Sequence, residues 1–249
     1  MISISRLSFG WISRDGKLLI ASHGISTFAR SFIAVLIALY LEKLGFSLIQ
    51  IGAFLSVSIA GGAFFTFLVS LISEKTGRKR LLILFTLISA VAGLVLVFVD
   101  NFLPLLFVAF LGGIQEQMGA TQPLEQAGIT DAAPEHKRTD LFAVYRIFAV
   151  AGAAFGALAA GLPAVLQDNS GISELDAYRV MFAAFSVFML IGVIFYSLLS
   201  RSIEGDSEKQ SWVNPLKLRS RKLIFTLTGL FSLDSFAGSL FPQSLAAYW

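Results

Sequence analysis

The sequence contains no cysteine and only two histidines, and 14% of its 249 residues are charged. Without cysteine the chain cannot form a disulfide or a thiolate metal site, and two histidines do not support a histidine-rich metal centre. The nucleophile elbow, the zinc-binding His-Glu-x-x-His helix and the phosphate-binding P-loop are absent as well. We therefore expect no metal, no cofactor and no enzyme activity. The basic residues lie between apolar runs rather than among exposed aromatics, which argues against a nucleic-acid partner.

Apolar residues make up 56% of the chain, and the mean hydropathy is +0.78. This composition leaves too little polar surface for a water-soluble protein of this length. A helix needs about 20 apolar residues to cross the hydrocarbon core of a bilayer. Seven such stretches predict an all-α, polytopic membrane protein with spans at 18–41, 48–72, 81–99, 102–121, 141–166, 180–199 and 223–249.

Lysine and arginine are distributed unevenly between alternate connections. Fifteen of the nineteen fall in one set, which includes 75–80 and 201–222. The opposite set holds only Lys43 and Arg179. Because positive residues are retained on the cytoplasmic side, we predict a multi-pass plasma-membrane protein with a cytoplasmic N-terminus and an external C-terminus.

Residues 70–80 join the second and third predicted spans and read SLISEKTGRKR. Gly77 permits a tight reversal with positive φ, and the neighbouring cations would hold the turn at the membrane surface. Glu74 can pair with these cations or cap a helix. Cytoplasmic retention alone would also explain the charges of this loop.

The same loop resembles the signature of the major facilitator superfamily, in which a glycine precedes an acidic residue by four positions and Gly-Arg-Lys or Gly-Arg-Arg follows. Ser70 replaces the leading glycine here, and Glu74 replaces the usual aspartate. The resemblance extends over nearly the whole chain and assigns a gating role to the loop residues Glu74, Lys75, Gly77, Arg78 and Lys79.

The resemblance implies a six-helix bundle with a 3+3 inverted repeat, a second such bundle, and a substrate site between them. We expect the six-helix bundle in residues 1–200, a cytoplasmic loop in 201–222, and in 223–249 a seventh helix that starts a second bundle missing from this chain. The chain would then supply about half of an alternating-access secondary transporter of a small organic solute, from a bacterial inner membrane by its likeness to prokaryotic members. The expected partners are lipid, the solute, a proton or cation, and the missing half or a second chain. The alternative is a non-transporting membrane fragment or an assembly partner.

Charged residues inside the spans are candidates for the transport pathway, because a charge in hydrocarbon is costly. Arg30 lies on the order of 18 Å into the first span, too deep for interfacial anchoring. The resemblance places the first and fourth helices at a central cavity, so we hypothesise a pair between Arg30 and Glu116. Gln115, Phe28 and Phe32 are expected to line the same wall.

Asp234 lies near the centre of the seventh span and is a candidate for proton or cation coupling, although a silent bond to a neighbouring serine is the alternative. We expect Glu125 at the cytoplasmic end of the fourth helix and favour a structural role for His23. Gly152 and Gly156 have the spacing of a close helix-packing face. The fourth and fifth spans lack the signatures of drug and proton antiporters, so antiport is unsupported.

Overall fold

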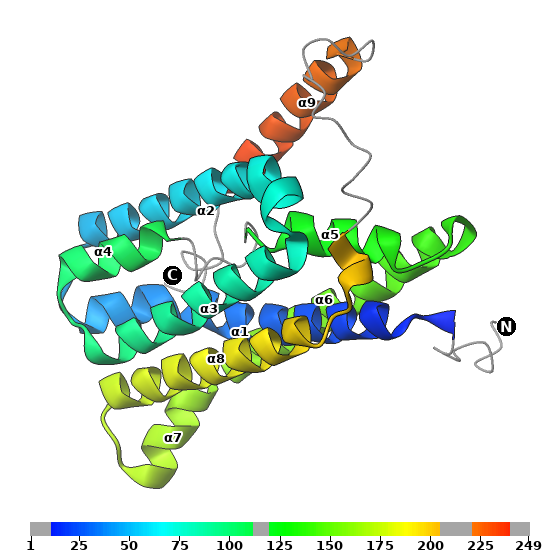
Figure 1. The fold of residues 1–249 in the computed structure, drawn as a ribbon. Helices are drawn as coiled ribbons and strands as arrows, with labels where there is room; N and C mark the ends of the chain where they lie inside the picture. The colour runs from blue at the N-terminus through cyan, green and yellow to red at the C-terminus, as the bar shows by residue number, and fades with distance from the viewer. Residues whose placement is uncertain (1–10, 112–119, 205–220, 240–249) are drawn as a thin grey trace, which may run out of the picture.

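Residues 11–111, 120–204 and 221–239 are described by a computed structural model of the chain, and their regular structure is helical (Figure 1). The α-helices are α1 (Arg14–Lys43), α2 (Leu48–Thr76), α3 (Arg78–Phe98), α4 (Phe102–Phe110), α5 (Gln122–Asp131), α6 (Arg138–Ala159), α7 (Leu162–Ser170), α8 (Glu174–Ser197) and α9 (Arg221–Ser239). Short 3₁₀ turns occur at η3 (Glu135–Lys137) and η4 (Arg201–Glu204).

Five helical segments are long and apolar enough to cross a membrane by length and composition. They are α1, α2, α3, the stretch Glu135–Ser170 with η3, α6 and α7, and α8, and they correspond to the first, second, third, fifth and sixth predicted spans. The chain is therefore an all-α protein with five candidate membrane spans among the residues described.

One predicted span is divided in the structure. The fifth, predicted at 141–166, breaks after Ala159 into α6 and α7. Pro163 explains this break, because its ring would clash with the carbonyl of Ala159 in a continuous helix. Of the fourth span, predicted at 102–121, the structure describes α4 and Thr121, which lies in a turn before α5; residues 112–119 are outside the described part.

Several helices begin at side chains that cap them, as their sequences favour. The Ser13 hydroxyl accepts the Gly16 N–H at 3.1 Å at the start of α1. Ser47 and Gln50 form a reciprocal capping box at the start of α2. These caps satisfy N–H groups that would otherwise have no partner in the first helical turn.

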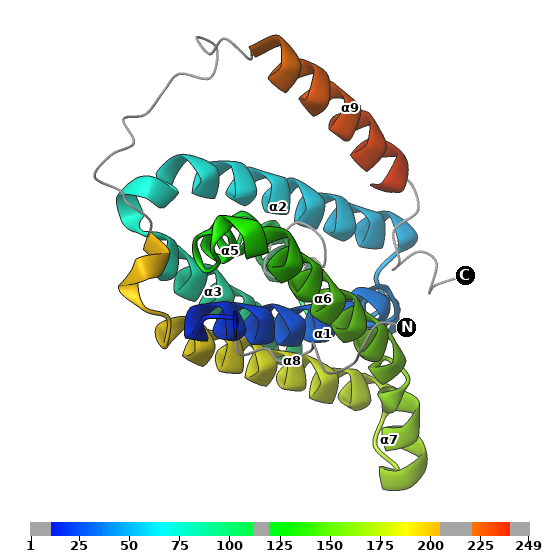
Figure 2. The same cartoon turned by 90° about the vertical axis from the view of Figure 1, so that its right-hand side faces the viewer.

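Helix α1 lies within the bundle and packs against α6 and α8, while α8 also packs against α3 (Figures 1 and 2). Helices α2 and α4 pack against each other. Helix α9 projects away from the bundle in Figure 1 and is separated from α2 in Figure 2, and Leu223 and Phe231 on it are exposed. It covers part of the predicted seventh span 223–249, whose last ten residues are outside the described part.

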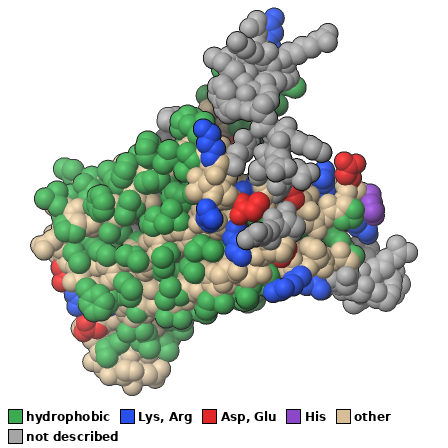
Figure 3. All heavy atoms as spheres, in the orientation of Figure 1, with side chains coloured by type: hydrophobic (Ala, Val, Ile, Leu, Met, Phe, Trp, Pro, Cys, Tyr) green, Lys and Arg blue, Asp and Glu red, His purple; other side chains and the backbone are tan. Residues whose placement is uncertain are grey.

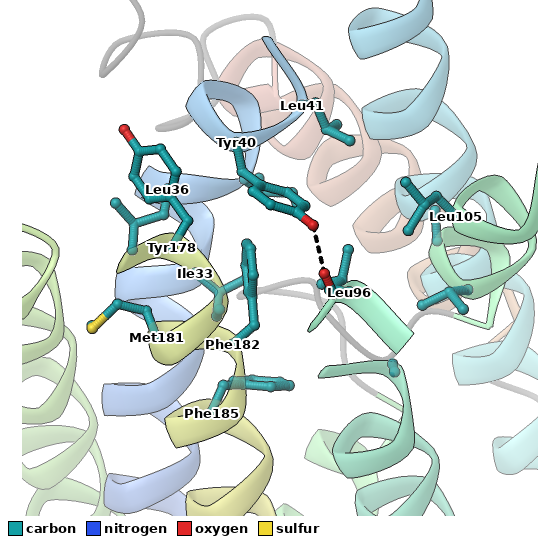
Figure 4. Packing of buried hydrophobic residues seen from close by; sticks show 14 of the residues in the cluster. Ile33, Leu36, Tyr40, Leu41, Leu96, Leu105, Tyr178, Met181, Phe182 and Phe185 are labelled. Atoms are coloured by element: carbon teal, nitrogen blue, oxygen red, sulfur yellow. Dashed lines mark hydrogen bonds between the residues drawn. The ribbon is translucent and has the colours of Figure 1, made fainter. Parts of the chain in front are cut away.

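The interior contains aromatic residues from α1 and α8 (Figure 4). The Tyr40 hydroxyl donates to the Leu96 carbonyl oxygen at 2.6 Å, so its polar atom is satisfied inside the apolar core. Its ring meets that of Phe182 edge-to-face, with centroids 4.7 Å apart. This cluster ties α1, α3 and α8 together.

Large apolar side chains also cover the outer surface of the helices (Figure 3). Phe67 on α2, Val91 on α3 and Ile194 on α8 are among those exposed. Lipid is the solvent that such a surface requires, because exposed apolar patches of this extent are rare on soluble proteins. The surface agrees with a multi-pass membrane protein.

Candidate functional site

Gly77 makes the reversal between α2 and α3 that the sequence predicts. Its φ is +91°, a left-handed conformation that glycine adopts without steric cost. A Cβ atom here would also lie 2.8 Å from Glu204 Oε2. The backbone N–H of Arg78 donates to the same oxygen at 2.6 Å, so the Glu204 carboxylate caps the N-terminus of α3.

The cations of this loop bind two other parts of the bundle. Arg78 Nη1 pairs with Asp131 Oδ2 at the end of α5, at 2.5 Å. Lys79 Nζ donates to the Leu199 carbonyl oxygen after α8, at 2.6 Å. The loop therefore joins the ends of α5 and α8, and we call this set of contacts around Gly77, Arg78 and Lys79 the clasp. Its predicted gating role stays a prediction.

The carboxylates that bind this loop in the structure are not the one that the sequence singled out. The side chain of Glu74 is outside the described part, so its pairing stays a prediction. Lys75 is exposed. Sequence reasoning missed Glu204 and Asp131, which are the described carboxylates that bind the loop. The available signal was their position, since each is an acid in a polar connection on the same predicted side as the loop.

Arg30 is buried in α1 with 7% of its surface exposed, as its depth in the span predicts. Its Nη2 donates to Ser89 Oγ on α3 at 3.1 Å. Glu116 and Gln115 fall in 112–119, outside the described residues, so the predicted pair between Arg30 and Glu116 is untested. A buried guanidinium in the middle of a span remains the clearest charged candidate.

The other predicted pathway residues lie at separate places. Phe32 is buried in the core, and the partly buried Phe28 meets its ring edge-to-face at 5.7 Å between centroids. Asp234 is exposed on α9, whereas Arg30 is buried in α1. The roles of these residues in a solute pathway stay predictions.

A buried polar cluster forms where α1, α5, α6 and α8 meet. Glu125 is 1% exposed. Its carboxylate contacts His23 Nδ1 at 2.6 Å, the Tyr145 hydroxyl at 2.7 Å, and the Tyr196 hydroxyl in a short hydrogen bond. The structural role expected for His23 stays a prediction, and the sequence did not predict that His23 and Glu125 would meet.

Glycines let α1 and α6 approach closely beside this cluster. A Cβ at Gly152 would lie 2.5 Å from the Gly24 carbonyl oxygen, and one at Gly156 would lie 2.2 Å from that of Phe28. The Ser31 hydroxyl donates to the Ala153 carbonyl oxygen across the same seam at 2.8 Å. The predicted packing role of the small-residue spacing is confirmed.

Comparison with known proteins finds relatives of this chain in a yeast and a bacterium. A protein described as "Uncharacterized membrane protein YJR124C" of Saccharomyces cerevisiae is 27% identical over 205 residues, which are 80% of this chain and 46% of that protein. The "Arabinose-proton symporter" of Bacillus subtilis is 28% identical over 113 residues, 45% of this chain and 22% of the symporter. The chain thus spans less than half the length of both relatives. They come from a yeast and a bacterium, so the bacterial inner membrane stays a prediction.

The family profile of the Major Facilitator Superfamily matches residues 19–248, which is more than half of the chain. The match includes the clasp at Gly77, the buried Arg30 and the cluster around Glu125. The chain therefore belongs to the Major Facilitator Superfamily, a family of membrane transporters and not of enzymes.

Proposed function

We propose that the chain supplies one six-helix bundle of a secondary active transporter, which moves a small organic solute by alternating access. Membership of the family implies membrane transport. Residues 1–200 would form the bundle, and 223–249 would begin a second one after the loop 201–222. The yeast relative is about twice as long as the segment it shares with this chain, since the match covers 46% of it. The second bundle would come from a longer product of the same gene or from a second polypeptide.

The buried Arg30 carries this proposal. It lies about 20 Å or more from either end of α1, which is farther than its side chain can reach toward water. A cation at this depth is costly and usually belongs to a substrate or ion pathway. In the family, the first helix faces the central cavity, where a guanidinium can bind oxygen atoms of an organic solute.

The charged ends of the bundle support the predicted orientation. One end carries the clasp with Arg78 and Lys79, and the other carries Lys43 and Arg179, which pair with Glu174 and Asp100. By the positive-inside rule, the clasp end and the N-terminus would be cytoplasmic. The clasp would hold the cytoplasmic ends of α3, α5 and α8 together in one state of the transport cycle and release them in the other.

Pentoses and protons are the first solute and ion to test, because the bacterial relative is described as an arabinose-proton symporter. The full chain would be reconstituted in liposomes, and uptake of radiolabelled arabinose and other small solutes would be measured. We expect Arg30→Gln to reduce uptake by about tenfold or more. Arg179→Gln is the matched control, because this arginine lies at the end of the bundle opposite the clasp, where it pairs with Asp100. Solute uptake by this variant should persist.

A negative result in these assays also has a defined meaning. If neither this chain nor a longer product of the same reading frame took up any solute, the alternative of a non-transporting fragment or assembly partner would replace the proposal.

Arg30 and Glu116 can be tested together within the same assay. Recovery of uptake on exchanging the two charges would support the pair, whereas two additive losses would exclude it. Asp234→Asn tests the coupling role proposed for that residue.

A further inference from the structure

Glu125 is held by three donors from three different helices. His23 on α1, Tyr145 on α6 and Tyr196 on α8 all contact its carboxylate, and both tyrosines are buried. Each tyrosine donates its hydroxyl hydrogen to one carboxylate oxygen. A buried carboxylate that accepts several hydrogen bonds is stabilised in its charged form. The cluster is therefore arranged around an anion rather than around a neutral acid.

The hydrogen bonds fix where protons reside on His23. The Tyr145 hydroxyl donates its hydrogen to Glu125, yet its oxygen lies 2.9 Å from His23 Nδ1. Nδ1 must then carry a hydrogen, and this one N–H serves both the contact to Tyr145 and the 2.6 Å contact to Glu125. A neutral imidazole has one N–H, so Nε2 is left without a hydrogen and can accept a proton. The ring of Tyr145 stacks on the imidazole at 3.9 Å between centroids and holds its orientation.

The exposure of the side chains also indicates that a proton would reach the cluster at the His23 imidazole. The His23 side chain is 13% exposed, against 2% for that of Glu125. Two arginines act on the cluster, since Arg30 interacts electrostatically with Glu125 and Arg146 with Tyr145. The charged groups of α2, α3 and η4 lie at the clasp. Lys75 is exposed, and Arg78 binds Asp131. Lys79 binds the Leu199 carbonyl oxygen, and Glu204 accepts the Arg78 N–H.

We propose that His23 and Glu125 form a proton-binding site inside the bundle. A hydronium ion gives one proton to His23 Nε2: an N–H bond forms, an O–H bond of the hydronium ion breaks, and a water molecule is released. The pair changes from one negative charge to a neutral imidazolium–carboxylate pair. Because Arg30 interacts with Glu125, this neutralisation weakens the attraction on the buried guanidinium and links proton binding to the candidate solute pathway. Only that link depends on the proposed transport function; the binding of a proton does not.

The chain has only two histidines, which makes the site directly observable. The full chain, labelled with ¹⁵N-histidine in lipid nanodiscs, should give imidazole signals from His23 and from the exposed His136. His136→Gln assigns them. We expect the His23 signals to change from a neutral to a charged imidazole over roughly pH 5 to 8. A His23 signal that stayed neutral across this range, while that of His136 changed, would overturn the proposal.

Two variants should move the His23 transition in opposite directions. Glu125→Gln removes the anion that stabilises the imidazolium, so the transition should move to lower pH, with proton affinity about tenfold weaker or more. Tyr196→Phe removes one donor to the carboxylate, so the transition should move to higher pH. A histidine with a merely structural role that binds no proton would show no transition in either variant. If Glu125→Gln does not fold, Tyr196→Phe still decides the question, and an unchanged transition there refutes the site.

The link between proton binding and transport is tested in the same liposomes, with a trapped pH-sensitive dye that reports proton movement. We expect His23→Gln to abolish proton movement and proton-driven uptake but to retain solute counterflow, which needs no net proton transfer. Wild-type solute uptake without proton movement would refute the link to transport and leave the proposed function intact. Absence of any uptake would refute the proposed function, while the histidine titration would still decide whether the proton site exists.

Discussion

Replacing Gly156 with alanine tests the close contact between α1 and α6. The added Cβ would lie 2.2 Å from the Phe28 carbonyl oxygen and 2.8 Å from Ser31 Cβ. Neither atom can swing aside, because one belongs to the backbone and the other is fixed to it. The helices must therefore separate by about 1 Å. The hydrogen bond from Ser31 to Ala153, now 2.8 Å long, would then be lost.

These effects can be combined into an expected magnitude. Overpacking costs about 1–3 kcal/mol and the lost hydrogen bond about 1 kcal/mol, while the higher helix propensity of alanine returns about 1 kcal/mol. We expect the variant to be about 1–3 kcal/mol less stable. The assay is unfolding of the full chain in mixed micelles with increasing dodecyl sulfate, followed by far-ultraviolet circular dichroism.

Gly52 provides the matched control for this experiment. It also lies inside a helix, but a Cβ there would meet nothing within 4 Å. Gly52→Ala should therefore be as stable as the wild type or up to about 1 kcal/mol more stable. If Gly156→Ala unfolded at the same detergent fraction as Gly52→Ala, the inferred close contact between α1 and α6 would be wrong.

Two further predictions use the same unfolding assay. Gly77→Ala should destabilise the chain more than Gly45→Ala. Both glycines have positive φ, so they share a strain of about 1 kcal/mol, but only a Cβ at Gly77 would collide with the Glu204 carboxylate. Equal losses would exclude a role for this collision. Tyr40→Phe should cost about 1 kcal/mol, because the hydrogen bond to Leu96 is lost while the ring keeps its packing; an unchanged midpoint would mean that this bond contributes nothing.

The clasp shows how far local sequence information reaches. Gly77 was predicted to reverse the chain, and its positive φ confirms this, because a short turn between two apolar helices leaves few backbone solutions. The partners of the adjacent cations were not predicted. Asp131 and Glu204 are 53 and 126 residues from Arg78 in the sequence, and only the packing of α3 against its neighbours brings them together.

The fifth span shows the opposite limit. Its hydropathy predicts one helix over 141–166, but the structure divides it into α6, which ends at Ala159, and α7, which starts at Leu162. Hydropathy measures only whether a segment prefers lipid, and it does not show where the helix is interrupted. Pro123 near the start of α5 and Pro163 near the start of α7 were the local signals for new helix starts.

The sequence by itself determined that this chain is helical, lies in a membrane, has two sides of different charge and resembles the family to which it belongs. These properties depend on composition and on spacing along one helix, which a linear sequence contains. Only the tertiary structure placed Glu125 against His23, Tyr145 and Tyr196. The hydrogen bonds of this cluster join residues that are 20 to 122 positions apart in the sequence. Their meeting depends on how four helices rotate and pack, and helix rotation is decided by contacts between distant segments.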